Sequence, residues 1–188
     1  ARERKRQHNI FRSHPHLSLQ TGCKLKRGKN KSKEVSLMDT IDKLKRALEQ
    51  GYLLHGSPHI TKGDCLEPRR ANLVTETTEV QEDHVLLYAT SHIELAVAVA
   101  VLRPGEGKSR QWSVSSPETG RVKIFGGENI NFKDGYVYVL PAKEFHEKEG
   151  DRGTFTATVP VVPIQKVKVT YQDLLDLQSE FGFTLDIR

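Results

Sequence analysis

The chain has 188 residues, of which 36% are hydrophobic and 28% charged, with a net charge of +5. This balance fits one globular domain with an appendage and excludes a wholly disordered chain. No run approaches the roughly 18 apolar residues of a membrane span, and the start lacks the apolar core of a signal peptide. Cys23 and Cys65 lie far apart without a zinc-binding spacing, so we expect reduced thiols, no metal and a cytoplasmic or nuclear protein.

The first 35 residues form a basic arm. Residues 1–33 hold eleven lysines and arginines against Glu3 alone, a net charge of +10, which leaves −5 for the rest of the chain. Their few apolar residues follow no helical or strand period, so we expect an extended segment that orders only on a partner. Such an arm neutralises the phosphates of RNA or DNA. The residues expected to do so are Arg2, Arg4, Lys5, Arg6, Arg12, Lys24, Lys26, Arg27, Lys29 and Lys31.

Two other interpretations of the arm stay open. It is either a solvated linker to an upstream part of a larger protein or complex, or a segment that packs on the acidic face of the body. We therefore divide the chain into an arm, residues 1–35, and one ordered domain, residues 36–188.

The ordered domain begins with a helix. Ser36 and Asp39 resemble a capping box, and an apolar stripe at helical spacing predicts a helix over 37–50. Gly51 supplies its stop. A short strand over 52–55 is expected to follow.

The next stretch, residues 60–78, is predicted to be a loop because it is rich in Gly, Pro, Asn and Thr. Arg69 and Arg70 stand close behind Pro68 in it. They are either exposed charges or a clamp for a phosphate-bearing ligand.

A second ordered unit starts with the apolar run 85–89, which predicts a buried strand. Ser91 and Glu94 make another capping-box pattern. The run 93–102 is too apolar for an exposed helix, so we expect a short buried helix, with a strand as its rival because of the valines.

The C-terminal half predicts strands separated by Gly, Asn, Asp or Pro, then a short helix. The strands are expected over 122–125, 135–140, 155–159 and 166–169, and the helix over 171–180. This order is an α+β pattern and not a doubly wound one. The chain lacks a GxGxxG after a strand, a Walker loop and an HExxH motif, which argues against the usual nucleotide and zinc-protease sites.

Two segments carry a family resemblance. Leu-Leu-His-Gly-Ser over 53–57 resembles the first signature of the poly(ADP-ribose) polymerase-like ADP-ribosyltransferases, in which a strand ends in His-Gly-Ser or His-Gly-Thr. Leu-Tyr-Ala-Thr over 87–90, followed by a helix, is similar to the second signature. The resemblance covers about 50–102 and implies a split β-sheet domain with a few short helices that binds NAD.

The resemblance also implies roles for single residues. His55 would hydrogen-bond the ribose hydroxyls of NAD, Gly56 would let the backbone reach the carboxamide, and Tyr88 would offer an aromatic face to the nicotinamide ring. His55 and Tyr88 are the candidate catalytic residues. The full set of expected NAD contacts is His55, Gly56, Ser57, Arg69, Arg70, Tyr88, Ala89 and Thr90.

The late strand of this chain departs from the family pattern. The stretch 164–171 resembles the strand that carries a glutamate in the polymerases, but Gln165 or Lys166 stands at that place. Monotransferases, inactive NAD-binding relatives and RNA 2′-phosphotransferases of this fold also lack that glutamate. Glu128 and Glu144 are other acids that could reach the site, although an exposed loop carboxylate is the ordinary state of each.

The expected function is therefore NAD-dependent transfer of ADP-ribose, or related NAD-dependent chemistry on an RNA 2′-phosphate, with a nucleic-acid or protein acceptor. The alternative is a non-catalytic nucleic-acid-binding module that keeps a degenerate transferase fold. The missing glutamate favours the module, and the intact His-Gly-Ser favours the enzyme.

Overall fold

The structure is a computed structural model that describes residues 39–61, 63–74, 79–104, 113–114, 121–125 and 130–187. The basic arm, with its ten predicted phosphate-binding residues, lies outside the described residues, as do Ser36 and Glu128. We call residues 39–187 the body. Within the described residues, no helix is long and apolar enough to cross a membrane.

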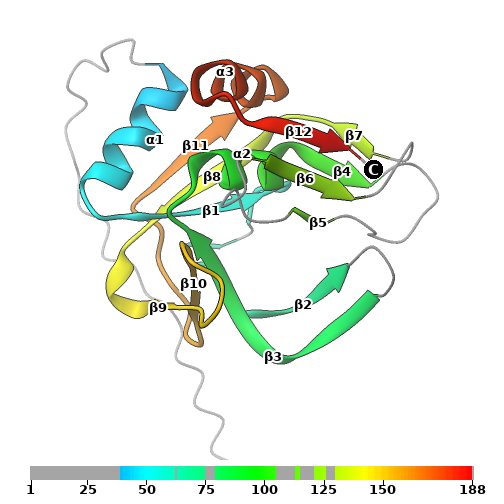
Figure 1. The fold of residues 1–188 in the computed structure, drawn as a ribbon. Coiled ribbons are helices and arrows are strands. Elements are labelled where there is room, and N and C mark those ends of the chain that lie inside the picture. The colour runs from blue at the N-terminus through cyan, green and yellow to red at the C-terminus, as the bar shows by residue number, and fades with distance from the viewer. Residues whose placement is uncertain are drawn as a thin grey trace, which may run out of the picture.

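A seven-stranded antiparallel sheet forms the centre of the body (Figure 1). One end of the strand order holds β11 (Gln165–Val169), β8 (Gly135–Leu140) and β1 (Leu53–Ser57). The other end holds β3 (Glu79–Thr90), β10 (Thr154–Ala157) and β9 (His146–Glu147), and β2 (Arg69–Val74) also pairs with β3. The mixed helix and strand content agrees with the predicted α+β class.

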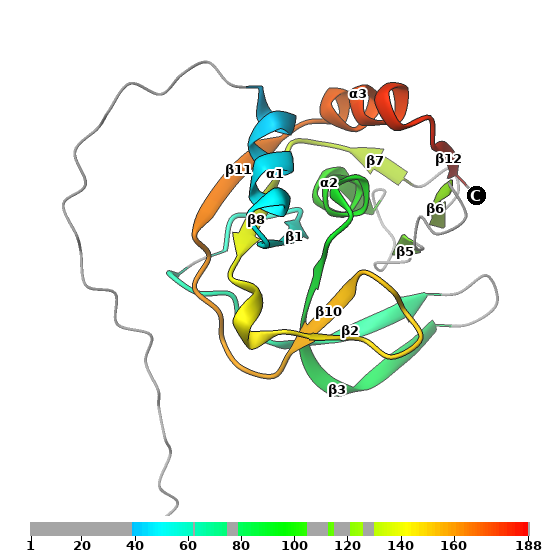
Figure 2. The same cartoon turned by 60° about the vertical axis from the view of Figure 1, so that its left-hand side comes forward.

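The two halves of this sheet meet at one residue pair. Leu54 of β1 pairs with Thr90 of β3, and beyond this pair the two strands take different partners. β1 runs along β8 over its whole length, whereas β3 runs along β10 and β2. In Figures 1 and 2, β2, β3, β9 and β10 extend away from the half of the sheet that carries the helices. The sheet therefore opens between β1 and β3 at the place where His55 follows Leu54.

Three helices cover the β1–β8–β11 half of the sheet on one face: α1 (Thr40–Glu49), α2 (Ile93–Val101) and α3 (Tyr171–Phe181). Asp39 caps α1, because its Oδ1 accepts a hydrogen bond from the backbone N–H of Ile41 at 3.3 Å. Thr170 and Asp173 form a capping box at the start of α3. The core residues that join helices and sheet include Leu44, Leu54, Val97, Val137, Val139, Val167 and Leu174.

The central helix α2 lies very close to the sheet. A Cβ on Gly56 would stand 2.1 Å from the carbonyl oxygen of Ala96, and one on Gly135 would stand 1.8 Å from that of Ala100. No real Cβ makes such contacts, so only glycine fits at these two strand positions. The alanines of α2 have small side chains, which also allow the helix backbone to lie close to the sheet. This packing explains why the apolar run forms a helix and not the rival strand.

Smaller elements complete the body. β4 (Leu102–Pro104) pairs with β7 (Ile130–Phe132), and a three-stranded sheet joins β5 (Ser113–Val114), β6 (Arg121–Phe125) and β12 (Thr184–Ile187). A single 3-10 turn, η3 (Ala142–Glu144), follows β8. A second core cluster lies on the opposite face of β1 and β8, with Leu53, Leu66, Tyr138, Leu140 and Phe145 among its members.

Two local predictions were wrong. The expected loop over 60–78 contains β2, which pairs with β3. The Ser91–Glu94 capping box does not form, because His92 is the N-cap residue of α2 and makes no side-chain cap hydrogen bond. The strand expected over 155–159 is β10, which begins at Thr154 and ends at Ala157. Like β10, the elements α1, β8 and α3 match their predicted ranges within three residues. The strand expected over 85–89 is longer than predicted, because β3 begins at Glu79.

Candidate functional site

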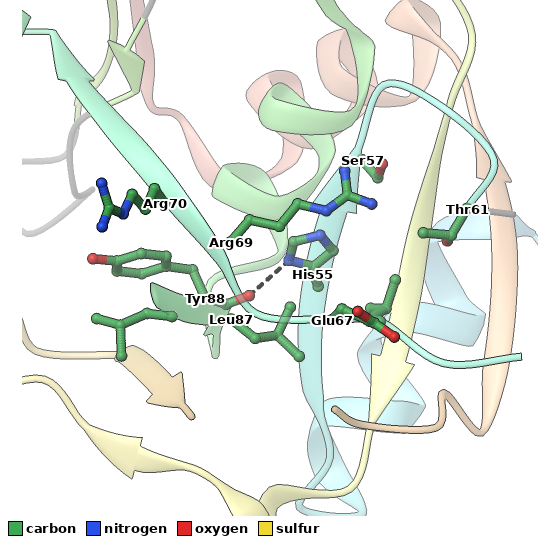
Figure 3. A pocket seen from close by; sticks show the side chains of 10 residues that line it. His55, Ser57, Thr61, Glu67, Arg69, Arg70, Leu87 and Tyr88 are labelled. Atoms are coloured by element: carbon green, nitrogen blue, oxygen red, sulfur yellow. Dashed lines mark hydrogen bonds between the residues drawn. The ribbon is translucent and has the colours of Figure 1, made fainter. Parts of the chain in front are cut away.

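His55 spans the opening between β1 and β3. Its Nδ1 lies 2.6 Å from the carbonyl oxygen of Tyr88 on β3, as the dashed line in Figure 3 shows. A carbonyl oxygen only accepts hydrogen bonds, so Nδ1 carries the proton and donates. Nε2 is then the unprotonated nitrogen of the neutral ring. His55 and Tyr88, the two candidate catalytic residues of the sequence analysis, are thus in direct contact across the gap.

Burial keeps the His55 ring neutral. Loss of solvent lowers the pKa of His55 below its ordinary 6.5, the hydrogen bond to Tyr88 opposes this shift, and the positive charge of Arg69 lowers the pKa further. The ring has partial solvent access and protein atoms on most sides. At neutral pH the site therefore presents an imidazole whose Nε2 can accept a hydrogen bond from a ligand hydroxyl.

Two cavities share His55 and Tyr88 as a common wall. The first, of about 200 Å³, opens toward β2 and is polar on one side (Figure 3). Its other lining residues include Ser57, Thr61, Glu67, Arg69 and Arg70. The second, of about 240 Å³, lies toward α2 and the β9–β10 hairpin. Its other lining residues include Gly56, Ala89, Thr90, Ala96, Lys148 and Asp151. All eight predicted NAD-contacting residues therefore line one cavity or both.

The two arginines flank the first cavity from the start of β2. Both side chains are exposed. In Figure 3 the guanidinium group of Arg69 extends past the His55 ring toward Ser57, while Arg70 lies on the side of Tyr88. Two guanidinium groups that line one cavity can supply positive charge for a phosphate or diphosphate.

The second cavity has a wall that the sequence interpretation missed. The hairpin between β9 and β10 brings Lys148 and Asp151 to the cavity, and Lys148 Nζ lies 5.1 Å from the centre of the Tyr88 ring. Gly150 and Gly153 have positive φ angles of 75° and 78°. The two glycines could have predicted a tight turn from the sequence. The sequence does not show that this turn lies beside the second cavity.

Glu144, an acid that the sequence analysis expected to be able to reach the site, lies on η3, and the nearby His146 lies on β9. Glu144 and His146 are exposed and line neither cavity. The prediction that Glu144 could reach the site is therefore not supported by the geometry of this structure.

Gly56 also has a structural reason to be glycine. Its missing side chain makes room for the backbone of α2, so the glycine is required by helix packing. Ser57 also has a local role, because its Oγ donates to the carbonyl oxygen of His59 at 2.9 Å and so shapes the turn after β1. Thr90 is buried and its Oγ1 donates to the carbonyl oxygen of Gly153 at 2.9 Å. These contacts hold the cavity walls in place.

The late strand β11 pairs with β8, which in turn pairs with β1. In β11, Lys166 pairs with Tyr138 of β8, and Tyr138 pairs with His55 of β1. Directly opposed residues lie on one face of a sheet, so Lys166 occupies the face of His55, two strands away. Lys166 Nζ lies 5.6 Å from the centre of the Tyr136 ring. Gln165 pairs with Val139 and belongs to the other face. The residue of β11 on the face of His55 is therefore a lysine, and not the glutamate that the resemblance implied for this strand.

The loop that follows β1 is held by hydrogen bonds from the half-buried side chain of Arg103. Arg103 donates hydrogen bonds to the carbonyl oxygens of Ala100 at 2.7 Å and Asp134 at 2.6 Å, and also to that of Pro58. This one side chain ties the segment behind Ser57 to the end of α2 and to the start of β8.

Comparisons with known proteins found no match: no family model, curated protein or solved structure is similar enough to this chain to be reported. Among the described residues, no group of three or more His, Cys, Asp or Glu side chains could hold a metal ion. The site must therefore be interpreted from its own geometry.

Proposed function

We propose that the body is an ADP-ribosyltransferase-like domain that binds NAD at His55 and Tyr88 and transfers ADP-ribose to a nucleic-acid or protein acceptor. The observation that carries this proposal is the neutral His55 ring, fixed through Nδ1 to Tyr88 in the wall between two cavities. A ring fixed in this way offers Nε2 as a directed acceptor.

The donor and acceptor groups of the site fit a dinucleotide. Nε2 of His55 accepts from a ribose hydroxyl, and the Tyr88 ring offers its face to a planar base. Arg69 and Arg70 supply charge for a diphosphate. Two adjoining cavities of about 200 and 240 Å³ suit the two halves of such a ligand better than one small metabolite.

These residues prepare the glycosidic bond for cleavage by position and by exclusion of water. His55 orients the ribose, and the cavity beside α2 encloses the base between Tyr88 and apolar side chains such as Leu95 and Val99. NAD, when bound, supplies the activated C1′–N bond. The proposed nucleic-acid acceptor rests on the basic arm. Residues 1–33 carry a net charge of +10, which favours binding to a polyanion such as RNA or DNA.

One observation favours the second candidate, a nucleic-acid-binding module without chemistry. Lys166 stands in the row of His55 and Tyr138, on the strand for which the resemblance implied a glutamate. A cation cannot take a proton from an acceptor or balance a positive ribose. The two candidates differ in whether bound NAD is cleaved.

The test is a calorimetric titration of NAD against the intact chain and two histidine variants. His55→Ala should weaken binding by about 1–3 kcal/mol, the loss expected when a buried polar contact disappears. His84→Ala, which removes an exposed imidazole from β3 outside both cavities, is the matched control and should bind as the wild type does. An affinity that His55→Ala leaves unchanged, or no binding at millimolar NAD, would contradict the NAD site.

Labelled NAD then separates the two candidates. Label transferred to RNA, DNA or a protein acceptor supports the transferase. Bound NAD that is neither cleaved nor transferred supports the module.

A further inference from the structure

The turn of the β9–β10 hairpin is a fixed structure. The backbone N–H of Lys148 donates to the carbonyl oxygen of Thr154 at 2.8 Å, and that of Asp151 donates to the carbonyl oxygen of Lys148 at 3.1 Å. The N–H of Thr154 donates to the carbonyl oxygen of Asp151 at 3.1 Å. Asp151 thus has both of its backbone polar groups bonded within the turn. These backbone hydrogen bonds fix the position of Asp151 in the turn.

Gly153 anchors this turn to the start of α2. Its carbonyl oxygen accepts from the N–H of Ser91 at 3.0 Å and from Thr90 Oγ1 at 2.9 Å, while its N–H donates to Glu147 at 3.0 Å. A Cβ at Gly153 would lie 2.3 Å from Nε2 of His92, whose side chain would have to move, and the φ of 78° also favours glycine there. The hairpin is therefore held against the end of the strand that carries Tyr88.

The turn places Asp151 in the second cavity. Asp151 is half-buried and lines this cavity together with His55, Gly56 and Tyr88. We propose that Asp151 is the catalytic carboxylate of the site and supplies from the hairpin the negative charge that β11 lacks at Lys166. This inference rests on the proposed function, because it assigns a role in the cleavage of NAD.

Glu67 is the competing acid. Among the described residues that line the two cavities, Glu67 and Asp151 are the carboxylates, and each lies in a different one. Glu67 is exposed and shares its cavity with two arginines, Arg69 and Arg70, whereas Asp151 shares its cavity with one lysine, Lys148. Asp151 is half-buried and fixed, and a charge with less solvent around it acts more strongly on a nearby ribose. These differences favour Asp151.

Asp151 is assigned a role in the cleavage of NAD, either by hydrolysis or by transfer of ADP-ribose. The C1′–N bond of NAD breaks, and its electron pair leaves on the ring nitrogen of neutral nicotinamide. The oxygen of water, or a hydroxyl of the acceptor, forms the new bond to C1′. The proton of that oxygen passes to the carboxylate of Asp151, which until then faces the positive charge that develops at C1′.

The test compares nicotinamide release with NAD affinity in the intact chain. Asp151→Asn keeps the shape of the side chain and removes its charge, so we expect release to fall at least about 100-fold while the Kd for NAD stays within about threefold. Glu149→Gln, a charge removal two residues away that lines neither cavity, is the matched control and should keep wild-type release. Glu67→Gln tests the competing acid, and its release should fall much less than that of Asp151→Asn.

Rescue by a small anion gives a result that a purely structural role would not. Asp151→Ala should lose release as Asp151→Asn does, and added formate should restore part of it, because the anion fills the place of the missing carboxylate. A change of fold in either variant is checked by thermal unfolding, and Asp151→Ser is the substitute for a variant that unfolds.

The possible results separate this inference from the function on which it rests. If the wild type binds and cleaves NAD but Asp151→Asn cleaves it equally fast, or Glu67→Gln alone loses cleavage, the role of Asp151 is wrong and the proposed function stands. If the wild type does not bind NAD, the proposed function fails and this inference fails with it.

Discussion

At the scale of single residues, His55 links the fold to the proposed chemistry. Its Nδ1 is used by the carbonyl oxygen of Tyr88, which fixes both the tautomer and the direction of Nε2. The same hydrogen bond joins the two halves of the sheet where their ladder ends at Leu54 and Thr90. Substitution of His55 thus removes a structural contact together with the proposed ligand contact. A change of pH keeps the ring in place and changes only its protonation, so it tests the charge of the ring separately.

Stability should depend on pH through His55. The folded state holds the pKa of His55 below 6.5, whereas the unfolded chain has the ordinary value. Below pH 6.5 the unfolded chain therefore takes up the proton first, and the free energy of unfolding falls as the pH falls. The stabilisation is complete above pH 6.5 and is lost progressively toward the lowered pKa of the folded state, at no more than about 1.4 kcal/mol per pH unit.

Chemical denaturation of the wild type and His55→Gln between pH 7.5 and 5 measures this effect. The amide of Gln keeps a donor but does not titrate, so the difference in unfolding free energy between the two proteins should shrink as the pH falls. A difference that stays constant over this range would show that the ring is not held neutral by its surroundings.

At the scale of elements, the sequence predicts those whose residues carry their own signal. Gly135–Leu140 is a run of β-forming residues bounded by Asp134 and Pro141, and β8 has those bounds. β2 was missed because Arg69–Val74 lacks alternation and becomes a strand by pairing with β3. For α2, composition left helix and strand open. The glycines of β1 and β8, which receive the helix backbone, decide between them.

The packing of α2 against β1 predicts the effect of a methyl group. Gly56→Ala and Gly135→Ala should each destabilise the body by about 1–3 kcal/mol or more, because either Cβ would overlap a carbonyl oxygen of α2. Thermal or denaturant unfolding measures both. Gln165→Ala, at an exposed strand position, is the control. If Gly56→Ala unfolds as the wild type does and loses only NAD affinity, the glycine serves the ligand and not the helix.

At the scale of the whole molecule, the site combines segments that the sequence could and could not bring together. His55 and Tyr88 were predicted from local motifs, and both line the two cavities. Lys148 and Asp151 reach the second cavity because β10 pairs with β3, from which it is separated by the whole middle of the chain. No local pattern encodes that pairing, so the hairpin wall could not be predicted. The position of Lys166 in the row of His55 likewise depends on the register of three strands.

The basic arm and the body should act as separable parts. Deletion of residues 1–33 removes eleven cations and should flatten the dependence of log affinity for RNA or DNA on log salt, because each phosphate contact contributes about 0.7–0.9 to that slope. NAD affinity should remain, since the cavities lie in the body. Transfer to nucleic acid should fall much more than NAD cleavage, because the arm raises the local concentration of the acceptor. Equal salt slopes with and without the arm would instead identify residues 1–33 as a linker.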